Sequence, residues 1–356
     1  MRDGAARLLD AKILSYLRAP RPARYERLAL QLFRHQYERS RVYRAYCGAC
    51  RTSPDQVRRW RDIPALPVTV FKEARVRSFT GRPELRFHTS GTTGGASRRG
   101  THELESARLY RTSLWASFRK HLLGGVPREP YLLVPTARRR PDSSLSYMAS
   151  EVCRRMGRPE RSYVTASHRV EVRRLTDDLS RERRPALIFA TAFSLKIWLD
   201  HLKDTGTILR LARGSRLMET GGFKGRTEAV SRRRLHALCV RRLGLAPSDC
   251  RSEYGMTELS SQAYARGASG RFRLPPWMRA IAADPLTGRQ LPYGRRGVLR
   301  FYDLANRSSV MAVQTEDAGR VYPDGFELEG RLSGAELRGC SLSYEQYLMA
   351  GRRGDR

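Results

Sequence analysis

The sequence predicts an α/β fold, and three observations support this class. Two short apolar runs, at 131–135 and 186–190, have the length and composition of strands buried on both faces. A third run, at 215–218, leads into a glycine-rich turn. Segments with helical spacing of apolar residues alternate with these runs, which is typical of α/β proteins. Because such folds bind ligands at the carboxyl ends of their strands, the turns there are candidate binding elements.

The first 80 residues are expected to be mainly helical. Apolar side chains recur on one face of 8–17 and on one face of 30–37. A further helix is expected to begin at Ser53, because Pro54 suits a first turn and Gln56 can reach back to close a capping box.

The last third of the chain has the pattern of a β-meander. Apolar runs at 280–283 and 297–302 are separated by a turn rich in Pro and Gly. We find no internal repeat, and no linker that would divide the chain before about residue 330.

The composition excludes some classes of protein. The 356 residues carry a net charge of +33, and nearly all of the positive charge comes from arginine. The use of arginine in place of lysine throughout the chain resembles a bias toward GC-rich codons. Nucleic acid is not the expected partner, because the arginines are dispersed rather than gathered with aromatic residues on one face. No apolar run approaches the roughly 18 residues of a membrane span. The start lacks the form of a signal peptide, so a cytoplasmic protein is expected.

Six cysteines are spread along the chain. Cys47 and Cys50 form a C-x-x-C pair that could bind zinc or carry redox chemistry. No second pair or nearby histidine pair completes a metal set, so two structural thiols are the favoured interpretation.

A loop of glycines and hydroxyl residues stands at the centre of the chain. It follows an apolar-containing stretch at 85–87, expected to be a strand, and precedes a helix expected from about His102. Consecutive N–H groups in such a loop can point at one anion, and hydroxyls add donors, so we expect a phosphate-binding loop. Its candidate residues are Thr89, Ser90, Gly91, Thr92, Thr93 and Gly94.

Four further motifs follow the loop in order along the chain. They are Thr220-Gly221-Gly222, Tyr254-Gly255-Met256-Thr257-Glu258, Glu316-Asp317-Ala318-Gly319 and Gly330-Arg331. Singly, Tyr254 could be a core aromatic, Asp317 a turn cap and Glu258 a surface charge. With the loop, the ordered set resembles the signature of the adenylate-forming superfamily.

The closer resemblance is to the LuxE family of acyl-protein synthetases, and the chain is also similar to phenylacetate–CoA ligases. The run from Gly221 to Lys224 resembles the Gly-Gly-aromatic-Lys of LuxE proteins, and the segment around Cys340 resembles the one that carries their acylated cysteine. The resemblance implies an adenylate-forming large domain with stacked sheets, flanking helices and a β-rich end. It places this domain at 1–329 and reduces the mobile C-terminal domain to a short tail, 330–356, with Cys340.

The resemblance implies ATP-dependent activation of a fatty or related carboxylic acid to acyl-AMP. The acyl group would then move to a cysteine thiol and on to a partner, an acyl reductase or an acyl carrier protein. ATP and Mg²⁺ are the implied cofactors. The implied nucleotide site comprises the loop residues, Gly221 and Gly222 in the adenine pocket, Tyr254 against adenine, and Gly255 of the same motif. Thr257 would contact phosphate, Glu258 would hold Mg²⁺, Asp317 would accept the ribose hydroxyls, and Arg331 would contact ribose or phosphate. Cys340 would be the acyl acceptor.

Two departures from the superfamily pattern bear on this interpretation. Arg98 and Arg99 stand where the signature lysine after the loop is expected, and no lysine follows Arg331. Lys224 is our candidate replacement. The alternatives are an acyl- or aryl-CoA ligase, and a non-catalytic protein that binds nucleic acid or acts as a scaffold.

Overall fold

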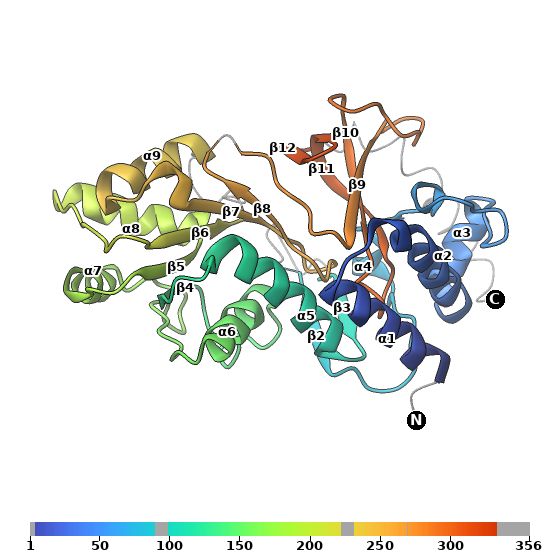
Figure 1. The fold of residues 1–356 in the computed structure, drawn as a ribbon, viewed down its shortest axis with the longest axis horizontal. Coiled ribbons are helices and arrows are strands. Elements are labelled where there is room, and N and C mark those ends of the chain that lie inside the picture. Colours follow the sequence, from blue (N-terminus) through green and yellow to red (C-terminus); the bar gives the residue numbers. More distant parts are fainter. Residues whose placement is uncertain (1–3, 90–98, 222–230, 269, 333–356) are drawn as a thin grey trace. The chain divides into compact units, whose positions relative to one another are not determined.

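The computed structural model describes residues 4–89, 99–221, 231–268 and 270–332 (Figure 1). The chain forms two compact units, each built from separate stretches of sequence. Unit 1 comprises Met1–Ser113, Met256–Ser261 and Arg273–Arg356, and unit 2 comprises Leu114–Gly255 and Gln262–Phe272.

Unit 1 begins with a layer of helices, as the sequence predicts. These are α1 (Gly4–Arg18), α2 (Pro22–Arg39), α3 (Arg41–Ala49), the 3-10 turn η1 (Trp60–Asp62) and α4 (Val70–Glu73). Helix α2 packs on the sheet of the same unit, since the Tyr25 hydroxyl donates to the carbonyl of Tyr302 at 2.8 Å and the Gln36 amide donates to that of Asn306 at 2.8 Å.

The expected meander forms the main sheet of unit 1. Its strands are β1 (Leu66–Pro67), β9 (Met278–Ala283), β10 (Arg296–Asp303), β11 (Ala312–Tyr322) and β12 (Gly325–Arg331). The order is β1-β11-β10-β9, and β12 pairs with β11. Gly319 is required inside β11, because an added Cβ would collide with the Glu327 carbonyl of β12. A separate hairpin joins β2 (Leu85–His88) to β3 (Thr101–Leu104).

Unit 2 is built on one sheet with the order β4-β5-β6-β7-β8. Strands β4 (Glu129–Leu133), β5 (Ala186–Thr191), β6 (Arg216–Thr220) and β7 (Cys250–Tyr254) are parallel, and β8 (Ala263–Arg266) is antiparallel to β7. The three apolar runs noted in the sequence are strands β4, β5 and β6, which confirms their prediction as buried strands.

Helices cover both faces of this sheet. One face packs on α7 (Val172–Arg181), α8 (Ala192–Asp204) and α9 (Arg232–Leu243), with Trp198 fully buried among them. The other face includes Phe189, whose ring stacks on Phe118 at the end of α5 (Ala107–Phe118). That helix continues as a π-helical turn, η2 (Arg119–Leu123), and α6 (Ser144–Met156) follows β4. Capping side chains start α6, α8 and α9, from Ser143, Thr191 and Ser231 respectively.

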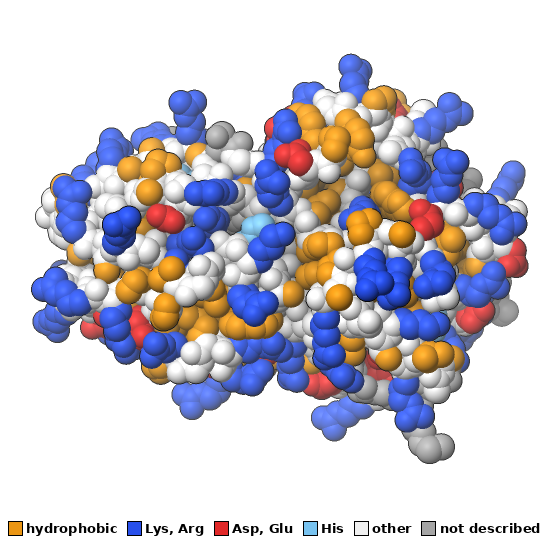
Figure 2. Space-filling model, viewed as in Figure 1, with side chains coloured by type: hydrophobic (Ala, Val, Ile, Leu, Met, Phe, Trp, Pro, Cys, Tyr) orange, Lys and Arg blue, Asp and Glu red, His pale blue; other side chains and the backbone are white. Residues whose placement is uncertain are grey.

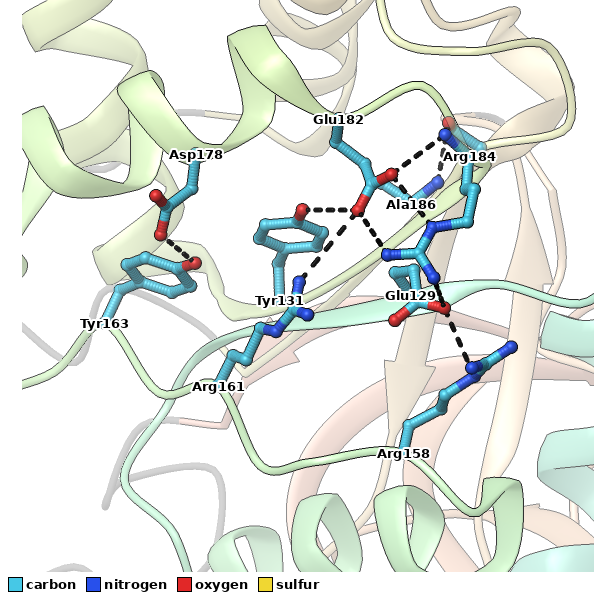
Figure 3. A network of polar contacts seen from close by, with 10 residues as sticks. Glu129, Tyr131, Arg158, Arg161, Tyr163, Asp178, Glu182, Arg184 and Ala186 are labelled. Atoms are coloured by element: carbon cyan, nitrogen blue, oxygen red, sulfur yellow. Dashed lines mark hydrogen bonds and ion pairs between the residues drawn. The ribbon is translucent and has the colours of Figure 1, made fainter.

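Ion pairs at the start of β4 and β5 tie the edge of this sheet to its loops (Figure 3). The carboxylate of Glu129 is buried and lies 3.0 Å from Arg184 and 3.2 Å from Arg158. Glu182 accepts from Tyr131 and Arg184, and the hydrogen bond from Arg184 is the main reason that its pKa falls to about 2. Arg184 therefore bridges the two carboxylates, and Arg158 is a second cation for Glu129.

Two local predictions were wrong. The chain after Ser53 forms a single turn rather than a helix: the Gln56 side chain does accept from the Ser53 N–H at 2.8 Å, but the turn ends at Gln56. Residues 101–104 form strand β3, not the start of a helix, which begins only at Ala107. Pairing of Arg86 with Glu103 across the hairpin holds that strand.

Lys and Arg side chains are scattered over the visible face of both units rather than gathered in one patch (Figure 2). Among the helices of the described ranges, none combines the length and apolarity needed to span a bilayer.

We expect Arg307→Met to destabilise the protein strongly. The Arg307 side chain is 1% exposed, bonds Asp10 of α1 at 2.7 and 3.0 Å and pairs with Glu105, so its removal leaves two carboxylates without their cation. Breaking a buried ion pair costs about 3–5 kcal/mol. Denaturant unfolding of the purified chain measures this cost.

The matched control for this variant is Arg34→Met. Arg34 pairs with Asp55 at 2.7 Å, but both side chains are more than half exposed. An exposed pair contributes at most about 1 kcal/mol. Equal losses in the two variants would contradict the structural role of Arg307.

Candidate functional site

The β2–β3 hairpin frames the glycine-rich loop. Thr89, just after β2, closes the base of the loop: its hydroxyl accepts from Gly100 N at 2.9 Å, and its N–H donates to the Gly100 carbonyl at 2.9 Å. Ser90, Gly91, Thr92, Thr93 and Gly94 lie outside the described residues. The loop is thus mounted between two antiparallel strands, where the sequence predicted a strand and a helix.

A buried carboxylate fixes this hairpin. Glu103 of β3 receives two hydrogen bonds from Arg75, at 2.7 and 2.8 Å, and one from Arg86 at 2.9 Å. Burial alone would raise the pKa of Glu103, but the bonds from Arg75 and Arg86 outweigh it and lower that pKa. The carboxylate is therefore ionised at neutral pH, and the base of the loop has two fixed cations.

His102 connects the hairpin to the segment that carries Thr257 and Glu258. Its Nδ1 lies 2.6 Å from the Thr257 carbonyl oxygen, and its Nε2 lies 3.0 Å from the Ser309 hydroxyl. Burial lowers the pKa of His102 to about 4, so the ring is neutral. Since a carbonyl can only accept, Nδ1 carries the proton and donates, and Nε2 accepts from Ser309.

The segment 256–261 is further held by Asp303, which ends β10, and by Asn306, which follows it. The Asn306 amide donates to the Glu258 carbonyl at 2.8 Å. Asp303 accepts from the Ser260 N–H at 3.0 Å and from the Ser261 hydroxyl at 2.7 Å. The backbone of this segment is thus fixed on both sides of Glu258.

The carboxyl group of Glu258 is 4% exposed. Burial is the main reason that its pKa rises to about 7, against the opposing charges of Lys72 and Arg331. A buried carboxyl with a raised pKa is one that a bound cation would stabilise in its ionised form. Lys72, on α4, was not singled out from the sequence, where it is one surface lysine in a short helix.

Strand register brings Asp317 and Arg331 together. They are direct partners between β11 and β12, and their side chains lie 3.6 Å apart. Arg331 also lies 3.7 Å from Glu316 and is 72% exposed, whereas Asp317 is 17% exposed. The two oxygens of such a partly open carboxylate can accept from two neighbouring hydroxyls.

Unit 2 contributes a second group of candidate residues, at the carboxyl ends of β6 and β7. The Thr220 hydroxyl donates to Glu253, and Gly221 follows with φ +73. Tyr254 is buried, with its ring centroid 5.9 Å from that of Phe272. Gly255 cannot be replaced without conflict, because an added Cβ would collide with the Glu253 carboxyl.

Glu253 is a titratable group that sequence reasoning missed. Burial is the main reason that its pKa rises to about 7, and nearby Glu219 adds to this rise. Gly222, Lys224 and Cys340 lie outside the described residues. Of the C-x-x-C pair, Cys47 is buried, and burial raises the pKa of its thiol.

Comparison with known proteins identifies the family. The model of the family described as acyl-protein synthetase, LuxE, matches residues 6–349. The long-chain-fatty-acid–luciferin-component ligase of Vibrio harveyi is 22% identical over 344 residues, which cover 91% of this chain and 88% of that protein. The ligase of the same name from Aliivibrio fischeri is 22% identical over 340 residues, covering 89% of this chain and 87% of that protein.

Solved structures confirm the adenylate-forming fold. An open conformation of 2-hydroxyisobutyryl-CoA ligase, in complex with 2-HIB-AMP and CoA, matches with a TM-score of 0.64 and 14% identity, over 89% of this chain and 79% of that one. ATP-bound MatB from Rhodopseudomonas palustris matches with a TM-score of 0.50 and 16% identity, over 71% of this chain. This chain spans about half the length of that protein, 49%.

The family match confirms the prediction of an acyl-protein synthetase made from the ordered motifs. It covers nearly the whole chain, and both curated relatives align over most of their own length. The chain therefore belongs to the LuxE family of acyl-protein synthetases.

Proposed function

We propose that this chain activates a fatty or related carboxylic acid with ATP and passes the acyl group through Cys340 to a partner. Membership of the acyl-protein synthetase family is the observation that carries this proposal. The curated relatives are named as ligases of long-chain fatty acids, which favours a long-chain acyl group. MatB was solved with ATP bound, which favours ATP as the nucleotide.

The reaction has two steps. In the first, a carboxylate oxygen of the acid attacks the α-phosphorus of ATP, the α–β phosphoanhydride bond breaks, and pyrophosphate leaves. In the second, the thiolate of Cys340 attacks the acyl carbon, the bond from that carbon to the AMP oxygen breaks, and AMP leaves. The product is an acyl thioester on the protein, from which a partner takes the acyl group.

The geometry of unit 1 supports the nucleotide assignment. Asp317 offers two carboxylate oxygens for the ribose hydroxyls, and Arg331 beside it offers donors to ribose or phosphate. The loop from Thr89 to Gly94 starts at a hairpin with two fixed arginines at its base, which suits a polyphosphate. The His102 bond to the Thr257 carbonyl fixes the backbone there, and the Thr257 hydroxyl is our candidate donor to phosphate.

Residues of unit 2 are assigned to the base of the nucleotide. Gly221 and Gly222 would let the backbone approach adenine, and Tyr254 with Gly255 would line the same pocket. Lys224 stays our candidate for the lysine that the C-terminal domain supplies in other adenylate-forming enzymes. Lys72 is a second candidate cation, because its charge acts on Glu258 in unit 1.

The residues present fit a magnesium ion at Glu258. Its carboxyl is a hard oxygen ligand, and burial raises its pKa to about 7, so a cation would favour the ionised form. Bound Mg²⁺ would neutralise charge on the phosphates. Protonation of the Glu258 carboxyl would compete with the ion, so we expect Mg²⁺ binding to weaken as the pH falls.

Cys340 is assigned as the acyl carrier from the family resemblance and from its surroundings in the sequence. Arg338 lies two residues away, and positive charge favours the reactive thiolate. Glycines stand at 334 and 339 of the sequence. The partner would be an acyl reductase or an acyl carrier protein, since either accepts an acyl group from a thioester.

The first expected outcome is carboxylate-dependent exchange of pyrophosphate into ATP by the purified chain. Long-chain fatty acids should support exchange better than short or aromatic acids. A panel of acids in the same assay measures this preference. Efficient formation of CoA thioesters would favour an acyl-CoA ligase instead, and absence of exchange with every acid would favour a non-catalytic protein.

We expect Asp317→Ala to raise the KM for ATP at least about tenfold, because hydrogen bonds to a charged group contribute about 1.5–3 kcal/mol each. The KM for the fatty acid should change little. Asp324→Ala is the matched control, since Asp324 lies in the turn of the same β11–β12 hairpin and is about half exposed. Equal KM values in both variants would place the ribose site elsewhere.

Cys340→Ser should separate the two steps. With ATP and labelled fatty acid, the variant should still form acyl-AMP, but hydroxylamine-sensitive labelling of the protein should disappear. Cys47→Ser is the control, because its buried thiol should not take the acyl group. Labelling that persists in Cys340→Ser, or is lost with Cys47 instead, would contradict the acyl-carrier role without affecting the adenylation step.

A further inference from the structure

Three arginines share one face of the unit 2 sheet, at the amino ends of β6 and β7. Arg216 opens β6, Arg251 is the second residue of β7, and Arg266 ends the antiparallel strand β8 directly opposite Arg251. Met218 is the strand partner of Arg251, and side chains alternate along a strand, so Arg216 lies on the same face as Arg251. Like charges in such neighbouring positions repel each other.

The carboxyl end of the η2 turn orients these guanidinium groups. Arg216 Nη1 donates to the Leu122 carbonyl at 3.0 Å, and Arg251 Nε donates to the His121 carbonyl at 3.2 Å. Gly124 ends the turn and allows the approach, because an added Cβ would lie 3.2 Å from Arg216 Nη1. The carbonyls compensate part of the positive charge, as expected at a helix C-terminus.

One more arginine and one carboxylate lie near these three arginines. Arg128 is close enough to feel the charges of Arg216 and Arg251, and it donates to the Gly214 carbonyl at 2.6 Å. The carboxylate of Asp249 lies 3.5 Å from Arg216 Nε. Within the described residues, this is the ion pair that the row of arginines makes. Burial first, and repulsion from Arg216 second, lower the pKa of both Arg128 and Arg251 to about 10. Within the described residues, the charge of Asp249 thus acts on Arg128, Arg216 and Arg251.

Arg251 has hydrogen-bonding capacity that its protein neighbours do not use. The residue is 5% exposed, and its Nη1 is buried without a hydrogen-bond partner within the described ranges. A buried donor without an acceptor is costly. Arg266, directly across the ladder, is exposed, so the row runs from a buried guanidinium to one at the surface.

We propose that Arg216, Arg251 and Arg266 form a binding site for a phosphate group, either inorganic phosphate or the end of a phosphate monoester. Planar guanidinium groups offer paired donors that match the oxygens of phosphate. A dianion would offset the repulsion within the row. Thr220 lies four positions after Arg216 along β6, roughly 13 Å away, so the site is separate from the proposed nucleotide residues and does not rest on the proposed function.

Phosphate titration of the full chain at constant ionic strength tests this site. Binding is followed by isothermal titration calorimetry with inorganic phosphate, and in a second arm with glycerol phosphate. We expect saturable binding by the wild-type chain. Arg251→Met should raise the Kd for phosphate about tenfold or more, because it removes a charge-assisted donor.

Because the chain carries a net charge of +33, phosphate could also bind non-specifically, and two matched variants separate that binding from binding at the row. Arg266→Ser alters only the exposed end of the row and should weaken binding even if Arg251→Met fails to fold. Arg241→Met removes an exposed charge of α9, outside the row, and should bind as the wild type does. Equal affinities in Arg266→Ser and Arg241→Met would overturn the site, and so would equal binding of chloride. Binding of phosphate but not of glycerol phosphate would assign the site to the free ion.

Discussion

The carboxamide of Asn306 holds together the parts of unit 1 that the candidate site needs. Its Nδ2 donates to the carbonyls of Glu258 and Val310, both at 2.8 Å, and its Oδ1 accepts from the hydroxyl of Ser260 at 3.1 Å. The residue is fully buried, so each unmade bond would cost the desolvation of a polar group. The segment 256–261 is a short insertion between two stretches of unit 2, and these bonds are what fix its backbone.

Register in the meander then determines which side chains surround that segment. A slip of one residue between β11 and β12 would move every side chain of β12 to the opposite face. The observed register pairs Asp317 with Arg331 and leaves Gly319 beside the Glu327 carbonyl, where only glycine fits. The glycine two residues after Asp317 therefore serves to position the carboxylate, whatever that carboxylate binds.

Periodicity and turn chemistry were sufficient to predict the strands of unit 2 and the meander, because these elements are specified by local apolar patterns. They failed after Ser53, where the chain forms only one turn, and at His102, where pairing with strand β2 determines the backbone. The candidate residues in short motifs could be named from sequence. His102, Asn306 and Glu253 could not, because their roles arise from burial and from partners distant in sequence, such as Thr257 for His102.

The structure gives arginine a physical role that composition alone did not reveal. Buried or half-buried carboxylates at separate places are held by guanidinium groups through two nitrogens: Arg75 on Glu103, Arg154 on Glu151 and Arg307 on Asp10. An ammonium group has no planar fork and could not make these paired bonds. A codon bias can supply arginines, but it does not place a buried carboxylate opposite them. At Arg216 and Arg251 the described residues supply one carboxylate, Asp249, and the same preference for paired oxygens suits the phosphate that we propose there.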